Sequence, residues 1–148
     1  MLTIQRLSYE DAVLLISGAE AKAQKIKVPM CIAVVDESGY LIAFKRMDHG
    51  KPLSTTLAQD KAYTAAISKK ATADYNAAAV PGNLTNGIQM AAGGRFSTVG
   101  GGIPVTVDGV VVGAIGLSGG APEQDIACAK AGIKAFRKVN PDCQADLT

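Results

Sequence analysis

The chain has 148 residues, of which 48% are hydrophobic and 19% charged, a composition that predicts a single folded domain over residues 1–148. Its formal net charge is only +2 and it has no run of five or more lysines and arginines, which argues against a nucleic-acid partner. No stretch approaches 18 consecutive apolar residues, and the N-terminus lacks the pattern of an export signal, so neither a membrane partner nor secretion is expected.

The three cysteines are odd in number and far apart, at positions 31, 128 and 143. This spacing matches neither a disulfide framework nor a paired zinc motif. The sequence therefore indicates a reducing compartment, and we expect a cytoplasmic location.

The first third of the chain predicts a helix, a β-hairpin and a second helix. Ser8 followed by Asp11 resembles a capping box, and apolar residues recur behind it at helical spacing over about residues 8–27. Two β-rich runs follow, Met30–Val35 and Tyr40–Arg46. A helix reaching about residue 70 comes next, with three candidate N-cap residues: Ser54, Thr55 and Thr56.

A short helix and an extended segment are expected in the middle of the chain. The alanine-rich helix covers Thr72–Val80 and ends before Pro81, because proline cannot continue the hydrogen-bond ladder. Phe96–Val99 can extend as a strand, and three glycines interrupt it.

Two strands and a helix complete the chain. Ile103–Val107 and Val110–Leu117 are predicted strands, joined by Asp108-Gly109, a dipeptide typical of a two-residue hairpin turn. Pro122 fits the first position of the last helix. The tail from Asn140 to Thr148 is expected to fray.

The order of these elements predicts an α+β fold. Strands and helices do not alternate in the way that a parallel sheet requires, so we expect an antiparallel sheet flanked by helices.

Segments spread over nearly the whole chain carry a recognisable pattern: Ala33–Asp36, the residues between Gly39 and Asp48, Ala58–Ala65, Gly101–Val105, Gly113–Gly116 and Ser118–Asp125. Together they resemble the GlcG/HbpS family, which also includes the C-terminal domain of PduO-type corrinoid adenosyltransferases. The resemblance implies a profilin-like or PAS-like fold with a five-stranded antiparallel sheet. It also implies haem binding in some members and assembly into dimers or larger oligomers. It carries over no iron ligand, because no single ligand position is shared by all members.

Two glycine-rich segments, Gly100-Gly101-Gly102 and Ser118-Gly119-Gly120, fall at the ends of strands that we expect to be neighbours. Glycine lets backbone amides approach a ligand, and the second segment precedes a helix N-terminus that favours a carboxylate such as a haem propionate. We predict that they bind the ligand, although tight turns and a bulge would explain the same glycines. Replacing Gly101 or Gly119 with valine is expected to weaken binding and to leave the fold intact.

His49 is the only histidine and follows the second predicted strand, which makes it the obvious metal ligand if haem binds. The alternative is a solvated loop residue. Its neighbours Met47 and Asp48 are also expected at the pocket. The fallback iron ligands are more simply explained by packing: Met47, Tyr63, Met90 and Cys31.

Lys61, on the second predicted helix, is expected to form a polar wall of the pocket by pairing with an acid or binding an anion. A solvated helix residue is the alternative. Glu123 and Asp125 are better explained by support of a helix N-terminus. A nucleophilic centre would depend on His49 as its base and has no supporting spacing, so hydrolysis is not expected.

These observations favour a small-molecule-binding protein, with haem or another tetrapyrrole as the leading ligand, accessory to a catabolic or cofactor pathway. One alternative is a cofactor-independent lyase or isomerase that acts on a small oxo or hydroxy acid through Lys61. A structural subunit of an oligomer is the other. A homo-oligomer is predicted because the alanine-rich second helix is expected to expose small side chains and because an open sheet leaves uncovered edges.

Overall fold

The computed structural model describes residues 1–141. In this part of the chain a four-stranded sheet of β1 (Cys31–Asp36), β2 (Leu41–Arg46), β3 (Gly102–Val107) and β4 (Val110–Ser118) packs against α1 (Tyr9–Ile26), α2 (Pro52–Ser68) and α3 (Pro122–Val139). The strand order is β2-β1-β4-β3, and all neighbouring pairs are antiparallel. The predicted α+β class is confirmed, but the described sheet has four strands instead of five.

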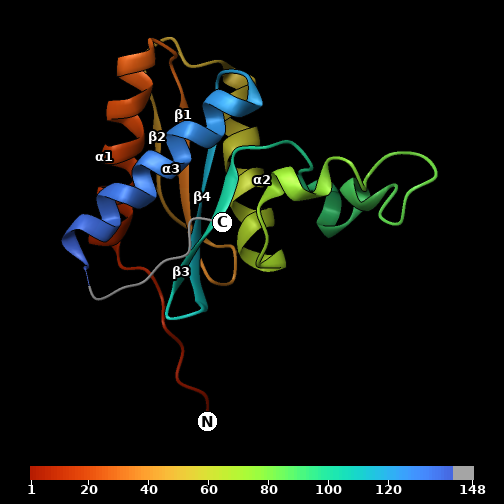
Figure 1. Cartoon of the computed structure of the whole chain (residues 1–148), viewed down its shortest axis with the longest axis horizontal. Helices are drawn as coiled ribbons and strands as arrows, with labels where there is room; N and C mark the ends of the chain where they lie inside the picture. The colour runs from red at the N-terminus through yellow and green to blue at the C-terminus, as the bar shows by residue number, and fades with distance from the viewer. Residues whose placement is uncertain (142–148) are drawn as a thin grey trace.

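The sheet lies between two helical layers (Figure 1). Helices α1 and α3 pack together on one face, and α2 covers the other. In β1, Ile32 and Val34 face α1 and α3, whereas Ala33 and Val35 face α2. A central strand that is covered on both sides favours apolar residues on both of its faces, which explains the uninterrupted hydrophobic run Cys31–Val35.

The predicted N-terminus of α1 is confirmed. The Ser8 hydroxyl accepts a hydrogen bond from the Asp11 amide at 3.1 Å, and the Asp11 carboxylate accepts one from the Ser8 amide at 2.9 Å. This reciprocal pair satisfies two of the amides that a helix start leaves open.

Helix α2 begins earlier than expected. Lys51 is its N-cap and Pro52 its first residue, so the predicted caps Ser54, Thr55 and Thr56 lie inside the helix. Proline fits a first helical turn because its fixed φ is helical and its missing amide is not needed there.

The alanines of α2 are buried, which contradicts the expectation that they face outward. Ala58, Ala62, Ala65 and Ala66 all pack against the sheet. A side chain at Gly116 of β4 would collide with the backbone of α2, since its Cβ would meet the Ala58 carbonyl oxygen and the Ala62 amide. Small residues on both sides therefore bring α2 directly onto the sheet.

The segment between α2 and β3 differs most from the sequence prediction. A 3₁₀ helix covers only Thr72–Tyr75, and turns replace the rest of the predicted helix to Val80. An alanine run has little apolar surface to bury, and helix propensity alone rarely stabilises so short a helix. Residues 76–95, which we call the projecting segment, extend away from the body of the molecule (Figure 1).

Phe96–Val99 is not a strand. The Ser97 amide donates to the Thr64 hydroxyl at 2.8 Å, and the Thr98 carbonyl accepts from the Asn76 side chain at 3.3 Å. Side chains thus satisfy backbone groups that would otherwise pair in a sheet.

The last part of the described chain matches the prediction. Strands β3 and β4 form the expected hairpin around Asp108-Gly109, and Pro122 opens α3. No helix within residues 1–141 combines the length and apolar character needed to cross a membrane. Most of the tail expected to fray, residues 142–148, lies outside the described residues.

Candidate functional site

The two glycine-rich segments meet at one end of the sheet, as predicted. Gly102 lies opposite Gly116 in the β3–β4 ladder, and the Leu117 amide donates to the Gly101 carbonyl at 3.0 Å. The Gly101 backbone therefore lies beside the end of β4, from which Ser118-Gly119-Gly120 leads to α3.

Lys61 lies next to these two glycine-rich segments, which we call the glycine-rich junction. Its side chain is buried and therefore not solvated. Its ammonium group donates to the Leu117 carbonyl at 3.0 Å and to Asp125 Oδ2 at 2.8 Å, and both charged side chains are only 3% exposed. The other Asp125 oxygen accepts the Gly120 amide at 3.0 Å. The Gly120 amide, which was expected to face a ligand, therefore donates to a side chain of α3 instead.

Burial dominates the electrostatics of Asp125. Removal from water raises the pKa of its carboxyl group above the ordinary value, while the hydrogen bonds from Lys61 and the Gly120 amide act in the opposite direction. The expected pairing of Lys61 with an acid is thus present, and it ties α2 to α3. Asp125 does more than support the helix N-terminus, which was its predicted role.

The glycines at this junction are required by packing. A Cβ at Gly101 would lie 2.6 Å from the Leu117 carbonyl oxygen, and the φ of Gly101 is +134°, which side chains disfavour. A Cβ at Gly119 would collide with the Pro29 carbonyl oxygen. The expectation that valine at either position leaves the fold intact is therefore wrong.

Gly100 and Glu123 line a hollow of about 250 Å³ on the flank of this junction, together with Ala73, Asn76, Val99, Pro122 and Ile126. Of the predicted site glycines, Gly100 lines this hollow, whereas Gly119 and Gly120 are partly exposed elsewhere on the junction. Neither Lys61 nor Asp125 lines this hollow.

Met47, Asp48 and His49 form a turn that connects β2 to α2. The turn closes with the Gly50 amide donating to the Met47 carbonyl at 2.9 Å, and His49 has a positive φ of 70°. Asp48 and His49 are exposed, whereas Met47 is partly buried and its sulfur accepts the Met30 amide at 3.4 Å. Met30 also packs on Gly119, so the turn and the Ser118–Gly120 segment share one end of the sheet.

The fallback ligands are dispersed. Cys31 is buried, with its thiol near the Thr55 hydroxyl, and Met90 is exposed on the projecting segment. Tyr63 lies on α2 under the Arg95 guanidinium. Within residues 1–141 no three His, Cys, Asp or Glu side chains cluster as a metal site would require.

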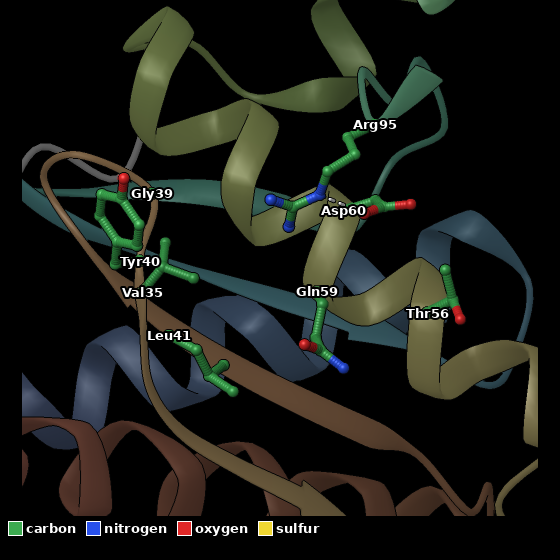
Figure 2. Close-up of a pocket in the computed structure, with 8 residues that line it drawn as sticks. All are labelled: Val35, Gly39, Tyr40, Leu41, Thr56, Gln59, Asp60 and Arg95. Atoms are coloured by element: carbon green, nitrogen blue, oxygen red, sulfur yellow. Dashed lines mark hydrogen bonds and ion pairs between the residues drawn. The ribbon is translucent and has the colours of Figure 1, made fainter. Parts of the chain in front are cut away.

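A groove between β2 and α2 was not predicted from the sequence. It has a volume of about 410 Å³, within the range of about 300–1,000 Å³ typical of ligand pockets. Figure 2 shows its eight lining residues: Val35, Gly39, Tyr40, Leu41, Thr56, Gln59, Asp60 and Arg95. One sequence signal was available, because Thr56, Gln59 and Asp60 recur at three- and four-residue spacing on α2 and therefore share a face of the helix.

The groove has apolar and charged parts. Leu41 supplies exposed aliphatic surface from the sheet, and the exposed ring of Tyr40 lies beside it, whereas Val35 is buried at the edge of the groove. Across the groove, Arg95 Nε donates to Asp60 Oδ1 at 3.1 Å. Such a groove can hold a ligand that has both an apolar body and an anionic group.

Comparison with known proteins identifies the family. A family model described as "Haem degrading protein HbpS-like" matches residues 7–134. The chain belongs to the HbpS-like family. It is 35% identical over 130 residues to the corrinoid adenosyltransferase PduO of Salmonella typhimurium, a match that covers 88% of this chain and 39% of PduO. The predicted family resemblance is confirmed.

Solved structures share the fold of this chain. The crystal structure of the Klebsiella pneumoniae protein ORFY has a TM-score of 0.90 and 32% identity, and the match covers 92% of this chain and 94% of that one. The crystal structure of a PduOC:heme complex has a TM-score of 0.84 and 35% identity, with 88% and 94% covered.

Proposed function

We propose that this chain binds haem or a related tetrapyrrole and acts as an accessory protein in a catabolic or cofactor pathway. The observation that carries the proposal is the likeness to the PduOC:heme complex, which extends over 88% of the chain at 35% identity. The proposal includes a cytoplasmic location, which fits the free, buried thiols of Cys31 and Cys128.

The side chains around the groove between β2 and α2 support the proposal. Leu41 and Tyr40 offer apolar and aromatic surface to the macrocycle, and Arg95 offers a cation to a propionate. The glycine-rich junction remains an alternative binding region, through the hollow beside Gly100. Bound haem would supply redox-active iron, while these residues would hold its plane and its carboxylates.

Two residues that flank β2 are candidates for the iron ligand. His49 is exposed in the turn after β2, and imidazole is a common axial ligand of haem iron. Tyr40 immediately precedes β2 and lines the groove, and its hydroxyl is a ligand type known from other haem proteins. Met47 and Asp48 lie in the same turn as His49.

Titration with haemin, followed by the Soret band, tests the proposal. We expect a saturable spectral shift with one haemin per chain and micromolar affinity. Absorbance that grows in proportion to haemin without saturation would contradict the proposed function. The same spectra of His49→Ala and Tyr40→Phe locate the iron ligand, with Tyr9→Phe as a control because Tyr9 is exposed on α1.

A further inference from the structure

The groove exists because α2 approaches the sheet unevenly. A Cβ at Gly102 of β3 would collide with the Lys61 carbonyl group, so α2 rests directly on the side of the sheet formed by β3 and β4. Strand β2 lies at the opposite edge, beyond the part of the sheet that α2 covers. The side chain of Leu41 is therefore about half exposed on the α2 side of the sheet.

Arg95 reaches this groove from the end of the projecting segment and is held at several points. Its carbonyl oxygen accepts the hydroxyl of buried Thr64 at 3.2 Å. Its guanidinium lies 3.9 Å from the centre of the Tyr63 ring and bonds through Nε to Asp60. Stacking on an aromatic ring and pairing with a carboxylate reduce the number of conformations open to an arginine.

Tyr63 is itself held in place. Gly39 has a φ of +87°, and a Cβ there would lie 2.6 Å from the Tyr63 ring, so the turn between β1 and β2 packs tightly on this ring. Asp36 stabilises this β1–β2 turn, because its carboxylate accepts hydrogen bonds from the amides of Ser38 and Tyr40 at 2.9 and 3.0 Å. Tyr63 thus contacts both the β1–β2 turn, which leads to Tyr40, and the guanidinium of Arg95.

The Arg95 guanidinium has more N–H donors than its contact with Asp60 uses. Arginine has five N–H groups, and the Asp60 contact uses the one on Nε. Within residues 1–141 no hydrogen bond satisfies the terminal nitrogens, which point away from Asp60 toward the Tyr40 side of the groove (Figure 2). The side chain of Arg95 is 45% exposed, so an anion in the groove can reach these nitrogens.

We infer that Arg95 is the carboxylate anchor of the groove and that Tyr63 is the residue that positions it. The ligand class is a flat, apolar molecule with at least one carboxylate, whose body lies over Leu41 and Tyr40 while the carboxylate pairs with the terminal nitrogens of Arg95. This assignment rests on the proposed tetrapyrrole function and adds where such a ligand is held and which group selects it.

Metal-free protoporphyrin and its dimethyl ester test the anchor, because they share a ring system and differ in their carboxylates. Binding of each is measured by porphyrin fluorescence with the unaltered chain, Arg95→Gln and Lys134→Gln. Lys134 is exposed on α3, on the opposite face of the sheet, so its replacement makes the same charge change away from the groove. Circular dichroism of each variant checks the fold.

We expect Arg95→Gln to weaken protoporphyrin binding about tenfold or more and to change binding of the ester less than about twofold. Lys134→Gln should change neither. Equal protoporphyrin affinity in Arg95→Gln and the unaltered chain would overturn the assignment of Arg95 alone, as would equal losses for the acid and the ester. If the unaltered chain binds neither haemin nor protoporphyrin, the proposed function fails together with this assignment.

Variants of Tyr63 test the positioning role. Tyr63→Phe keeps the ring under the guanidinium and should keep protoporphyrin affinity, whereas Tyr63→Leu should lose a similar factor to Arg95→Gln for the acid only. A loss of ester binding of the same size in Tyr63→Leu would instead indicate damage to the groove itself and would overturn the positioning role.

Discussion

The ammonium nitrogen of Lys61 and Oδ2 of Asp125 lie 2.8 Å apart, and each side chain is only 3% exposed. The pair joins α2 to the N-terminal turn of α3. Each partner has a second contact, Lys61 with the Leu117 carbonyl and Asp125 with the Gly120 amide. The two charged groups therefore pair with each other and with backbone groups at the end of β4 and the start of α3. Loss of either side chain leaves the other charge buried without its partner, which lowers the stability of the fold.

Lys61→Met is expected to lower the free energy of unfolding by about 3–5 kcal/mol, because it leaves Asp125 buried without its partner. The double variant Lys61→Met with Asp125→Leu should recover much of that loss, since it removes both buried charges. Chemical denaturation of the single and double variants measures both values. A double variant that loses the sum of the two single losses would show that the charges do not act as a pair.

The stability of Lys61→Met should also fall as the pH rises. Burial already raises the pKa of the Asp125 carboxyl above its ordinary value of 3.8, and removal of Lys61 takes away the largest opposing contribution. A carboxyl group with a raised pKa in the folded state stabilises the fold below its unfolded pKa, and this stabilisation is lost as the pH rises through the folded value. Melting temperatures should therefore decrease as the pH rises above the unfolded pKa, until the pH has passed the folded pKa.

A matched variant isolates the contribution of Asp125. Lys61→Met with Asp125→Asn has no titrating group at this position and should show a flat profile between pH 5 and pH 8. Glu37 does not disturb this window, because its hydrogen bond with Arg6 lowers the pKa of the Glu37 carboxyl to about 2. Parallel profiles for the two variants would contradict a role for Asp125.

The elements predicted correctly are those whose signals are local. The capping pair of Ser8 and Asp11 marks the start of α1, and Asp108-Gly109 marks the hairpin between β3 and β4. Phe96–Val99 was predicted as a strand and is not one, because its backbone bonds to the side chains of Thr64 and Asn76. The residues in those contacts are more than twenty positions apart in the chain, so the contacts produce no periodic pattern in the sequence.

The candidate site depends on contacts of the same long-range kind. Arg95 meets Asp60 across 35 residues, and Lys61 meets Asp125 across 64. A lysine among alanines on a helix can be either solvated or paired with a buried acid, and the sequence alone does not distinguish these two environments. Only the fold does. The convergence of the glycine-rich segments was predictable because both border neighbouring strands, whereas the groove required knowledge of how α2 lies on the sheet.

Gly119 and Gly120 are expected to differ sharply in their tolerance of alanine. A Cβ at Gly119 meets backbone, the Pro29 carbonyl oxygen, whereas the nearest atom to a Cβ at Gly120 is the movable end of the Gln124 side chain. Gly119→Ala should therefore cost about 1–3 kcal/mol of unfolding free energy, and Gly120→Ala distinctly less. Thermal denaturation compares them, and a larger loss at Gly120 would contradict the packing explanation.

Self-association remains a prediction, on different grounds from those the sequence offered. The alanines of α2 are buried within the chain, so they provide no contact surface for a partner. The projecting segment instead exposes apolar side chains, with Leu84 98% and Met90 80% exposed. Strands β2 and β3 form the two edges of the described sheet, and uncovered edges favour pairing.

We therefore expect a homo-oligomer, with an even number of chains because two-fold symmetric assemblies are the commonest. Light scattering coupled to gel filtration at micromolar concentration should give a mass that is an even multiple of 15.2 kDa. Replacing Leu84 and Met90 together with serine should shift the mass toward that of the single chain, since it removes apolar surface from the projecting segment. Leu53→Ser provides the control, because Leu53 is also exposed but lies in the first turn of α2. A single-chain mass for the unaltered protein would contradict self-association, and an unchanged mass for the double serine variant would move the contact away from the projecting segment.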